Sequence, residues 1–512
     1  MLKVESYKKG IVLSTFFNIF NKGLVFLNSL LIAYYFGTSE KMDIYFYAYN
    51  TVLIVATFIT SINTSVIIPE SIRIRIQDGE SSAMIFINLF IFGYISVAIL
   101  ISLVFFVNPV WVFTSLSKYD QGALARHSDI LLLSIPLIIL MSVTSLLTDI
   151  LASYRYFTIP VIAAIINSVF SLVFVLFYHN ILDSKSIVFG LLTSYTLNIV
   201  LLIGIMRKKI GWQPKLKFFP VTKKIWHNII FVQTGNFATS LGLYAPLYFL
   251  SGFEVGVIAS LNYAQQIVTQ PTSFITNQIS AVSRIRINEL YALKDFTRVN
   301  DIFISTVKFL VFILLPLSGL FFLFPNEIIS ILFKRGSFDI KSVEVSASLL
   351  KYLALSLPFT AIISIASNLY MSAQQIKIPI LYQIFSNVIQ VALIGLSVSW
   401  AGYIGYPIAL LTMSVLNVLV IYLFFTRLFP FIRYESILRY LIIMIGVHTI
   451  LILSLKLILK YTFHINEIIL IVVAGSVYVA ALIFLSFRLK LNTDFNNFIS
   501  NTWGRLSSAK KT

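Results

Sequence analysis

Cysteine is absent from this sequence of 512 residues. Disulfides, thiolate metal sites, cysteine nucleophiles and palmitoylation are therefore excluded. Charge is scarce as well, because Asp, Glu, Lys and Arg together make up only 11% of the chain, against about 25% in an average soluble domain. Acidic residues are the scarcer kind, with 20 Asp and Glu against 38 Lys and Arg. Such a composition has too little polar surface for a soluble fold of this length.

Long apolar segments occupy most of the chain instead. Hydrophobic residues make up 58% of it, and the mean hydropathy is +0.91. A helix needs about 20 apolar residues to cross a bilayer, where lipid offers the backbone no hydrogen-bond partner. We predict an all-α polytopic membrane protein with about 14 transmembrane helices, near residues 11–36, 43–68, 82–107, 128–152, 157–179, 185–206, 225–250, 252–280, 304–325, 343–371, 378–400, 403–426, 436–460 and 466–487. No small-residue cleavage site precedes the first span, so we expect a retained helix and not a signal peptide.

Basic residues are concentrated on one side of the predicted bundle. With fourteen spans, both termini and the loops after even-numbered spans lie on the same side, and they hold 26 of the 38 Lys and Arg residues. Positive charge marks the cytoplasmic side. We therefore expect a multi-pass protein with both termini cytoplasmic and with the basic loop 207–224 close to anionic lipid headgroups. Nucleic acid is not an expected partner, because no soluble basic domain is left to bind it.

The chain contains an internal repeat. Residues 153–169 (SYRYFTIPVIAAIINSV) match residues 372–388 (SAQQIKIPILYQIFSNV) at an offset of 219, and residues 191–198 match residues 410–417 at the same offset. An even number of spans in each repeat would give both halves the same orientation in the membrane. Transporters built from such repeats bind substrate between the halves and rock one half against the other.

The repeat predicts two pseudo-symmetric six-helix lobes, 1–216 and 217–430. Two further helices and a cytoplasmic tail follow in 431–512. An old duplication that now has only a scaffolding role is the alternative.

Polar side chains form stripes on the first two spans of each repeat. Residues three, four or seven positions apart lie on one face of a helix, and a lipid-facing surface carries few amides. The candidate substrate-binding residues are Asn18, Asn21, Lys22 and Asn28 in span 1, Asp43, Tyr47 and Asn50 in span 2, Gln233 and Asn236 in span 7, and Asn262, Gln266, Thr269 and Ser273 in span 8. We interpret the stripes as the lining of a hydrated cavity. For a single Ser or Thr, a hydrogen bond between helices is the alternative.

Lys22 lies deep within the first span. It is about eleven residues from the start of the span, or about 16 Å at 1.5 Å per residue, and a charge at this depth costs at least about 2.5 kcal/mol on the insertion scale. Asp43 is a poor partner, because it lies on the order of 20 Å away along the bundle. Two interpretations stay open: a neutral or hydrogen-bonded structural lysine, or a charged lysine in a wet cavity that binds an anionic ligand such as phosphate.

Five segments, spread over most of the chain, resemble one family of membrane transporters. They are FGTSEKMDIYFYAY (36–49), RYFTIP (155–160), NYAQQIVTQP (262–271), ILFKRGSFD (331–339) and LKYLALSLP (350–358). On these segments the chain is similar to the lipid II flippase (MurJ/MviN-type) family, within the multidrug, oligosaccharidyl-lipid and polysaccharide exporter superfamily. The fourteen-span count is also typical of this family.

The resemblance implies a flippase of the bacterial inner membrane that moves an undecaprenyl-pyrophosphate-linked saccharide to the outer leaflet by alternating access. It also implies a headgroup cavity between the first two helices of each repeat and a lipid-tail groove at the last two helices. Arginines in the family's cavity fall here on Lys22, Asn28, Ala56 and Gln266, so Lys22 is the one cation retained, and lysine lacks the bidentate fork of arginine. We therefore expect a cargo that is either lipid II-like or a polysaccharide repeat unit.

Two other classes of function fit the residues less well. A cation-coupled drug exporter of the same superfamily needs acidic residues deep in a bundle, and no predicted span has one at its midpoint. A membrane-embedded glycan polymerase needs catalytic motifs, and no HExxH, nucleophile elbow, phosphate loop or paired-acid constellation occurs. We expect a transporter without metal or cofactor that functions as a monomer, with a lipid-linked glycan and membrane lipids as partners. Coupling to membrane potential or to an ion stays open.

Overall fold

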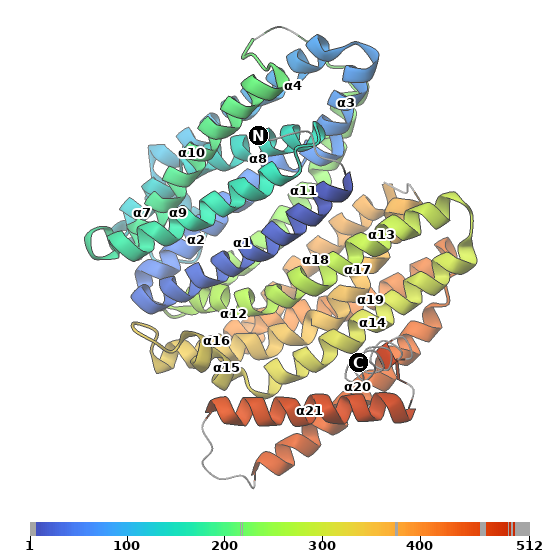
Figure 1. The fold of residues 1–512 in the computed structure, drawn as a ribbon. Coiled ribbons are helices and arrows are strands. Elements are labelled where there is room, and N and C mark those ends of the chain that lie inside the picture. Colours follow the sequence, from blue (N-terminus) through green and yellow to red (C-terminus); the bar gives the residue numbers. More distant parts are fainter. Residues whose placement is uncertain are drawn as a thin grey trace, which may run out of the picture. The chain divides into compact units, whose positions relative to one another are not determined.

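The computed structural model describes residues 7–215, 217, 219–373, 377–460, 467–489, 491–492 and 495–496. Every regular element in this part of the chain is a helix (Figure 1). The predicted all-α class is therefore confirmed. The two chain ends and most of the expected tail lie outside the described residues, so the predicted side of the termini stays a prediction.

Each predicted span coincides with one helix or with a helix broken into segments. The first six are α1 (Tyr7–Phe36), α2 with η1 and α3 (Glu40–Thr60, Asn63–Ile67, Ile68–Gln77), α4 (Glu80–Val107), α7 with α8 (Ser128–Ser134, Leu137–Ser153), α9 (Thr158–Leu182) and α10 (Lys185–Ile210). The next six are α11 (Lys223–Leu250), α12 with η2 and α13 (Val257–Pro271, Thr272–Thr276, Asn277–Ala292), α14 (Phe296–Leu323), α16 with η3 and α17 (Ile340–Leu353, Ala354–Ser356, Leu357–Ser372), α18 (Lys377–Ala401), and η4 with α19 (Gly402–Ile404, Gly405–Leu428). The last two are α20 (Tyr434–Lys460) and α21 (Glu467–Leu489), and the short helices α5 (Pro109–Ser115), α6 (Gln121–Arg126) and α15 (Pro325–Phe333) lie between spans.

Eleven helical stretches of the described chain are long and apolar enough to cross a membrane. One of them contains both α18 and α19, while α11 and the broken helix α12–α13 are not among them. These two helices carry the polar stripes of the second repeat, such as Gln233 and Gln266, which lower their hydropathy. The multi-pass membrane class is confirmed, and the count of fourteen stays a prediction.

The internal repeat is visible in the helix lengths. Helices α9 and α18 both have 25 residues and begin 219 positions apart, at Thr158 and Lys377, while α4 and α14 both have 28 residues. The second span of each repeat is interrupted by a five-residue π turn, η1 and η2. A π turn shifts the backbone hydrogen-bond register by one residue and often marks a functional position. Both repeats therefore keep the same local irregularity.

The described chain forms two compact units that do not follow the repeat. The first unit comprises residues 1–262, 335–342 and 380–398, and the second comprises 263–334, 343–379 and 399–512. The first six spans, α11 and most of α18 belong to the first unit. The lobe boundaries predicted above follow the duplication of the chain and stay a prediction.

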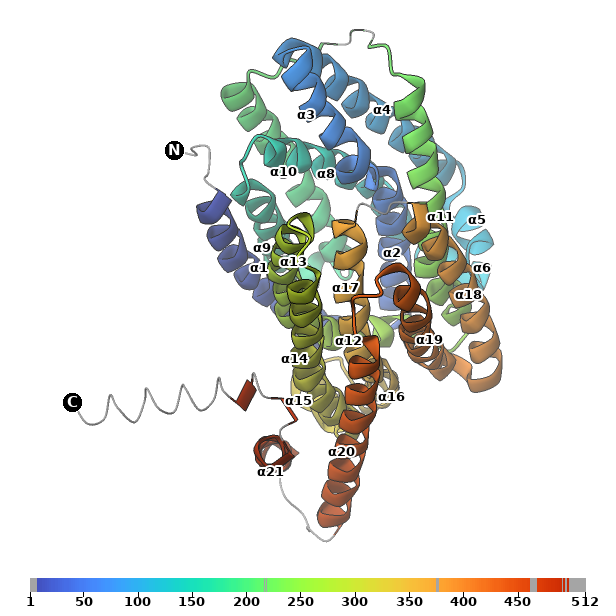
Figure 2. The ribbon, with the colours of Figure 1, turned by 90° about the vertical axis from the view of Figure 1, so that its right-hand side faces the viewer.

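Apolar helix faces hold each unit together. In the first unit, α9 packs against α1 and α10, and α2 packs against α8 and α11 (Figure 1). In the second unit, α14 packs against α17 and α20 (Figure 2), and its core contains the fully buried rings of Phe303 and Phe425. Burying a Phe side chain is worth about 1.5–3 kcal/mol. Apolar packing thus fixes the long helices in register. The positions of the polar side chains in the site follow from this packing.

Candidate substrate-binding site

Lys22 lies at the middle of α1, with its side chain half-buried. Among the described residues, no hydrogen bond or ion pair satisfies its ammonium group. Asn18, one helical turn earlier, is exposed and likewise makes no hydrogen bond within the described chain. A membrane helix rarely carries an unpaired cation that has no functional role. Lys22 and Asn18 are thus two polar groups of α1 that have no partner in the described chain.

The other two amides of the α1 stripe contact α9. Ser168 donates a hydrogen bond of 2.7 Å to Asn21 Oδ1, and Asn28 Nδ2 donates one of 2.9 Å to Ser171 Oγ. Asn21 is buried, and the Oδ1 atom of Asn28 is also buried but accepts no hydrogen bond from the part of the chain that the structure describes. Both amides therefore attach α1 to α9, the interhelical role that the stripe pattern left open.

Asp43 caps a helix from a distant part of the chain. Its side chain is 2% exposed, and its two carboxylate oxygens accept hydrogen bonds of 2.7 Å each from the backbone N–H groups of Gly256 and Ala259. These groups lie at the start of α12, where the first N–H groups of a helix have no partner within the helix. A carboxylate there also has favourable interactions with the helix dipole. Asp43 thus joins the first turn of α2 to the first turn of α12.

Tyr47 and Asn50 continue this attachment along α2. The Tyr47 hydroxyl donates to the carbonyl oxygen of Phe113 at 2.9 Å and lies 2.9 Å from the Tyr244 hydroxyl of α11. Asn50 Nδ2 donates to Asn262 Oδ1 of α12 at 3.2 Å. The polar groups of α2 are consequently bonded to α11 and α12 within the first unit.

The two candidate residues on α11, Gln233 and Asn236, differ in their hydrogen bonding. Gln233 accepts a hydrogen bond of 2.9 Å from Ser61 and donates one of 3.2 Å to the carbonyl oxygen of Phe58, so it joins α11 to the end of α2. The Nδ2 atom of Asn236 is buried and has no hydrogen-bond partner among the described residues. An unpaired buried donor is costly. Asn236 is therefore a donor that a ligand could satisfy.

The remaining candidates, Gln266, Thr269 and Ser273, belong to the second unit. Gln266 accepts a weak contact of 3.4 Å from Gln270, and the exposed hydroxyl of Thr269 donates to the Gln266 carbonyl oxygen at 3.3 Å. Ser273 lies within the π turn η2. Their predicted place in a substrate cavity stays a prediction.

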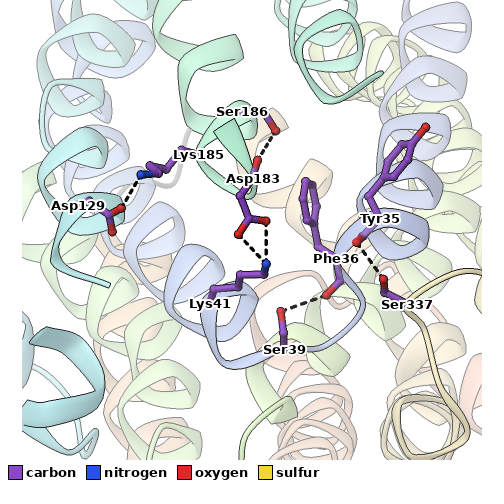
Figure 3. A network of polar contacts seen from close by, with 9 residues as sticks. All are labelled: Tyr35, Phe36, Ser39, Lys41, Asp129, Asp183, Lys185, Ser186 and Ser337. Carbon is purple, nitrogen blue, oxygen red and sulfur yellow. Dashed lines mark hydrogen bonds and ion pairs between the residues drawn. The ribbon is translucent and has the colours of Figure 1, made fainter. Parts of the chain in front are cut away.

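One end of the first unit is fastened by ion pairs and hydrogen bonds that sequence reasoning missed (Figure 3). Lys41 Nζ lies 2.7 Å from both carboxylate oxygens of Asp183, and Lys185 lies 2.9 Å from Asp129. Figure 3 also shows the Ser337 hydroxyl donating to the Tyr35 carbonyl oxygen, at 2.9 Å. The Asp183 and Ser337 contacts join the region of the turn between α1 and α2 to the turn before α10 and to segment 335–342, and the Lys185–Asp129 pair joins α10 to α7. By the charge distribution, this is the end predicted to be extracytoplasmic.

Two glycines make the contact with segment 335–342 possible. Gly37 and Gly336 both have φ near +59°, and Ser337 N donates to the Tyr34 carbonyl oxygen at 2.8 Å. A Cβ on Gly336 would lie 2.2 Å from that same carbonyl oxygen, and one on Gly37 would lie 2.2 Å from the Ser337 carbonyl oxygen. Only glycine adopts this conformation readily and allows two backbones to approach so closely. The Arg335–Phe338 segment was one of the family-like motifs, but its partner could not be read from the sequence.

A polar network lies within the first unit at the π turn η1. Asn63 Nδ2 donates to Asp149 Oδ2 at 2.7 Å, and the Tyr94 hydroxyl donates to Asn63 Oδ1 at 2.6 Å. A cavity of about 270 Å³ lies between α2, α8, α9 and α10, with Thr57 and Thr60 of α2 in its lining. Thr57 and Thr60, near the end of α2, therefore face the interior of the first unit's own helix bundle.

Together these contacts divide the predicted site into two groups of residues. Asn21, Asn28, Asp43, Tyr47, Asn50, Gln233 and Asn262 form hydrogen bonds that hold helices together. Lys22, Asn18 and the Asn236 Nδ2 atom have no hydrogen-bond partner among the described residues. One cation and several amide groups can bind an anionic group and hydrogen-bond hydroxyls, and no group of His, Asp and Glu suited to a metal ion occurs among the described residues.

Known proteins that resemble this chain in sequence and in fold are lipid II flippases and related transporters. The chain is 23% identical over 424 residues to the probable lipid II flippase MurJ of Borreliella burgdorferi, covering 80% of this chain and 81% of that one. Its fold is similar to a solved structure of lipid II flippase MurJ in an inward-closed conformation, with a TM-score of 0.75, 17% identity, and coverage of 93% of this chain and 100% of the other. It is also similar to an inward-facing multidrug resistance MATE family transporter of the MOP superfamily, with a TM-score of 0.66, 12% identity, and coverage of 80% and 95%.

The model of one protein family, described as lipid II flippase MurJ, matches residues 32–474. This range contains α2 to α20 in full and the adjoining parts of α1 and α21, and it leaves out most of α1, including Lys22. The family consists of transporters and not of enzymes, as the sequence predicted. This chain, with its all-helical membrane fold, belongs to the lipid II flippase MurJ family.

Proposed function

We propose that this protein is a flippase that carries a lipid-linked saccharide across the bacterial inner membrane. The observation that carries the proposal is the Lys22 ammonium group, which has no partner in the described chain although it lies midway along a membrane-spanning helix. A cation at that depth is costly unless water or an anion accompanies it. The pyrophosphate that joins a polyprenyl lipid to its saccharide is such an anion.

Neighbouring amides suit the saccharide part of the same cargo. Sugar hydroxyls both donate and accept hydrogen bonds, and an amide side chain offers both functions. Asn18 lies one turn from Lys22 on α1, and Asn236 on α11 has an unpaired donor. A single lysine holds pyrophosphate as a point charge, more weakly than a cluster of arginine forks does. The cargo class is therefore a lipid II-like molecule or a polysaccharide repeat unit.

Transport by alternating access requires that the two ends of the protein open in turn. The contacts of Ser337 with Tyr34 and Tyr35 join the two predicted lobes and would have to separate at the predicted extracytoplasmic end. The Lys41–Asp183 ion pair lies within the first predicted lobe and could stay intact. We expect both termini in the cytoplasm and function as a monomer without a cofactor, with the driving force supplied by membrane potential or an ion.

Complementation of a flippase-deficient bacterial strain tests the role of Lys22. Lys22→Ala and Lys22→Glu should abolish growth rescue, while Lys22→Arg should retain part of it because the positive charge remains. None of the three should lower the melting temperature of the purified protein, since Lys22 has no partner to lose. Lys223→Ala, at the start of α11, is the control and should rescue like the wild type.

The choice of strain identifies the cargo. Rescue of a strain that lacks its lipid II flippase would indicate a lipid II-like cargo. Rescue only of a strain that lacks a polysaccharide-unit flippase would indicate a polysaccharide repeat unit as the cargo. Full rescue by both Lys22→Ala and Lys22→Glu would remove Lys22 from the mechanism.

A further inference from the structure

A second cavity, of about 630 Å³, lies entirely within the second unit. It is bounded by α14, the end of α19, the turn that follows and the first three turns of α20. The turn is fastened to α14, because the backbone N–H of Arg433 donates to Asn300 Oδ1 at 2.9 Å. Ligand pockets commonly have volumes of about 300–1,000 Å³. The cavity is therefore of a size that holds a small polar headgroup.

Positive charge dominates the lining of this cavity. Lys308 from α14 and Arg433 and Arg439 from the turn and α20 face a single lining carboxylate, Glu435. Arg433 also lies 3.9 Å from Asp301, and both of these side chains are largely exposed. Three cations against Glu435 in the lining and Asp301 beside it leave a net positive charge that suits an anion.

Lys308 is the least accessible of the three cations. It lies within the membrane-spanning helix α14, and its ammonium group is 5.4 Å from the centre of the Tyr440 ring. Such cation–π contact holds the side chain beside the ring without removing its charge. The Ser436 hydroxyl also lines the cavity and adds a hydrogen-bond donor, whereas the Thr426 hydroxyl in the lining already donates to the Leu423 carbonyl oxygen at 3.0 Å. Phosphate oxygens are well matched by this mixture of cations and a hydroxyl donor.

The cavity continues onto an apolar surface. Ile443 lines it and is 45% exposed, and the adjacent Ile442 on α20 is 69% exposed. On α19, Leu423 lies one turn before the lining residue Thr426 and is 60% exposed. A ligand with a charged head and long apolar chains could therefore bind the cations and extend its chains along these helices. A free inorganic anion would not contact this apolar surface.

We propose that this cavity binds the phosphate group of an anionic phospholipid from the surrounding bilayer. Basic pockets between membrane helices on the cytoplasmic side bind such headgroups, and the turn between α19 and α20 is on the side that the charge distribution predicts to be cytoplasmic. The site is separate from Lys22, which belongs to the first unit. Its occupant stabilises the contact of α20 with α14 and α19.

Native mass spectrometry of the purified full-length protein tests the proposal. The probes are phosphatidylglycerol, phosphatidylcholine and inorganic phosphate, each added alone to protein in the same detergent. We expect retained phosphatidylglycerol on the wild type, little phosphatidylcholine and no retained inorganic phosphate. The double variant Lys308→Gln with Arg439→Gln should weaken phosphatidylglycerol binding by on the order of tenfold.

Two further variants separate lipid binding from loss of the fold or of general charge. Lys308→Arg with Arg439→Lys keeps both charges and should bind phosphatidylglycerol like the wild type. Lys294→Gln with Arg298→Gln removes two cations from the same predicted side outside the cavity, and it should also bind normally. Equal loss in this control, or wild-type binding by the neutralised cavity variant, would overturn the proposal. Displacement of the lipid by inorganic phosphate alone would overturn the lipid as the occupant.

Discussion

Asp43 Oδ1 lies 2.7 Å from the backbone nitrogen of Ala259, a residue 216 positions further along the chain. With the second bond from Gly256, this carboxylate supplies partners for two N–H groups that the start of α12 leaves open. The second span of the first repeat is thereby attached to the second span of the other repeat. Asp43, a candidate substrate-binding residue from the sequence, is thus, in this structure, a helix cap.

Asp43→Ala should lower the stability of the purified protein. Loss of a side-chain cap costs about 0.5–2 kcal/mol, and Asp43→Asn should cost less because one acceptor oxygen remains. Thermal unfolding in detergent measures both. Asp120→Ala is the matched control, because Asp120 caps the short, exposed helix α6 by a bond of 2.8 Å to Gly122 N. The expectation is that the buried Asp43 cap contributes more to stability than the exposed Asp120 cap. A larger fall in melting temperature for Asp120→Ala than for Asp43→Ala would contradict it.

Gly336→Ala should weaken the contact between segment 335–342 and the end of α1. Its φ of +59° costs an L-residue about 1–2 kcal/mol, and the added Cβ would lie 2.2 Å from the Tyr34 carbonyl oxygen. Gly204→Ala in α10 has nothing within 4 Å of its new Cβ and should be neutral or stabilising by up to about 1 kcal/mol. Gly336→Ala should therefore lower the melting temperature, whereas Gly204→Ala should leave it unchanged or raise it. Equal values would argue against a close backbone approach at Gly336.

The Tyr47 and Tyr244 hydroxyls should be energetically coupled. Tyr47→Phe removes a buried hydroxyl that contacts both Phe113 and Tyr244, and we expect a loss of about 1 kcal/mol. A double-mutant cycle with Tyr244→Phe should give a coupling energy of about 0.5 kcal/mol or more. Tyr248→Phe, on the exposed side of α11, is the control and should change stability little. Strict additivity of the two losses would show that the hydroxyls do not interact.

The hydrogen bonds from Ser342 to the Asp339 carboxylate should make the stability of the protein depend on pH. Hydrogen bonds from the Ser342 hydroxyl, at 2.6 Å, and from the Ser342 backbone N–H, at 2.8 Å, lower the pKa of Asp339 below its usual value. Because the folded pKa is lowered, the stabilisation is present above the unfolded pKa of about 3.9. It is lost as the pH falls through the folded pKa.

The Ser342→Ala variant isolates this effect. Its melting temperature should fall below that of the wild type at pH 7, and the difference should shrink as the pH falls below about 4. Asp339→Asn should remove the pH dependence of the difference. A gap between wild type and Ser342→Ala that stays constant across this range would show that Asp339 is not involved.

The amino-acid sequence by itself determined the helices and their duplication. Span lengths follow from bilayer thickness and backbone hydrogen bonding, both of which act within a single helix. The Ile-Pro pairs at 159–160 and 378–379 therefore predicted two helices 219 residues apart, and α9 and α18 begin at that spacing. The isolated cation Lys22 could be identified in the same way, since an acidic partner within reach would itself have been visible in the sequence.

Only the tertiary structure decided what each polar side chain contacts. Helical spacing shows that residues share a face, but it does not show whether that face meets water, lipid or another helix. Asn21 and Lys22 are neighbours in α1, yet Asn21 bonds to Ser168 of α9 while Lys22 has no partner in the described chain. The difference arises from the rotation of α1 against α9, and that rotation is set by apolar packing between segments about 140 residues apart.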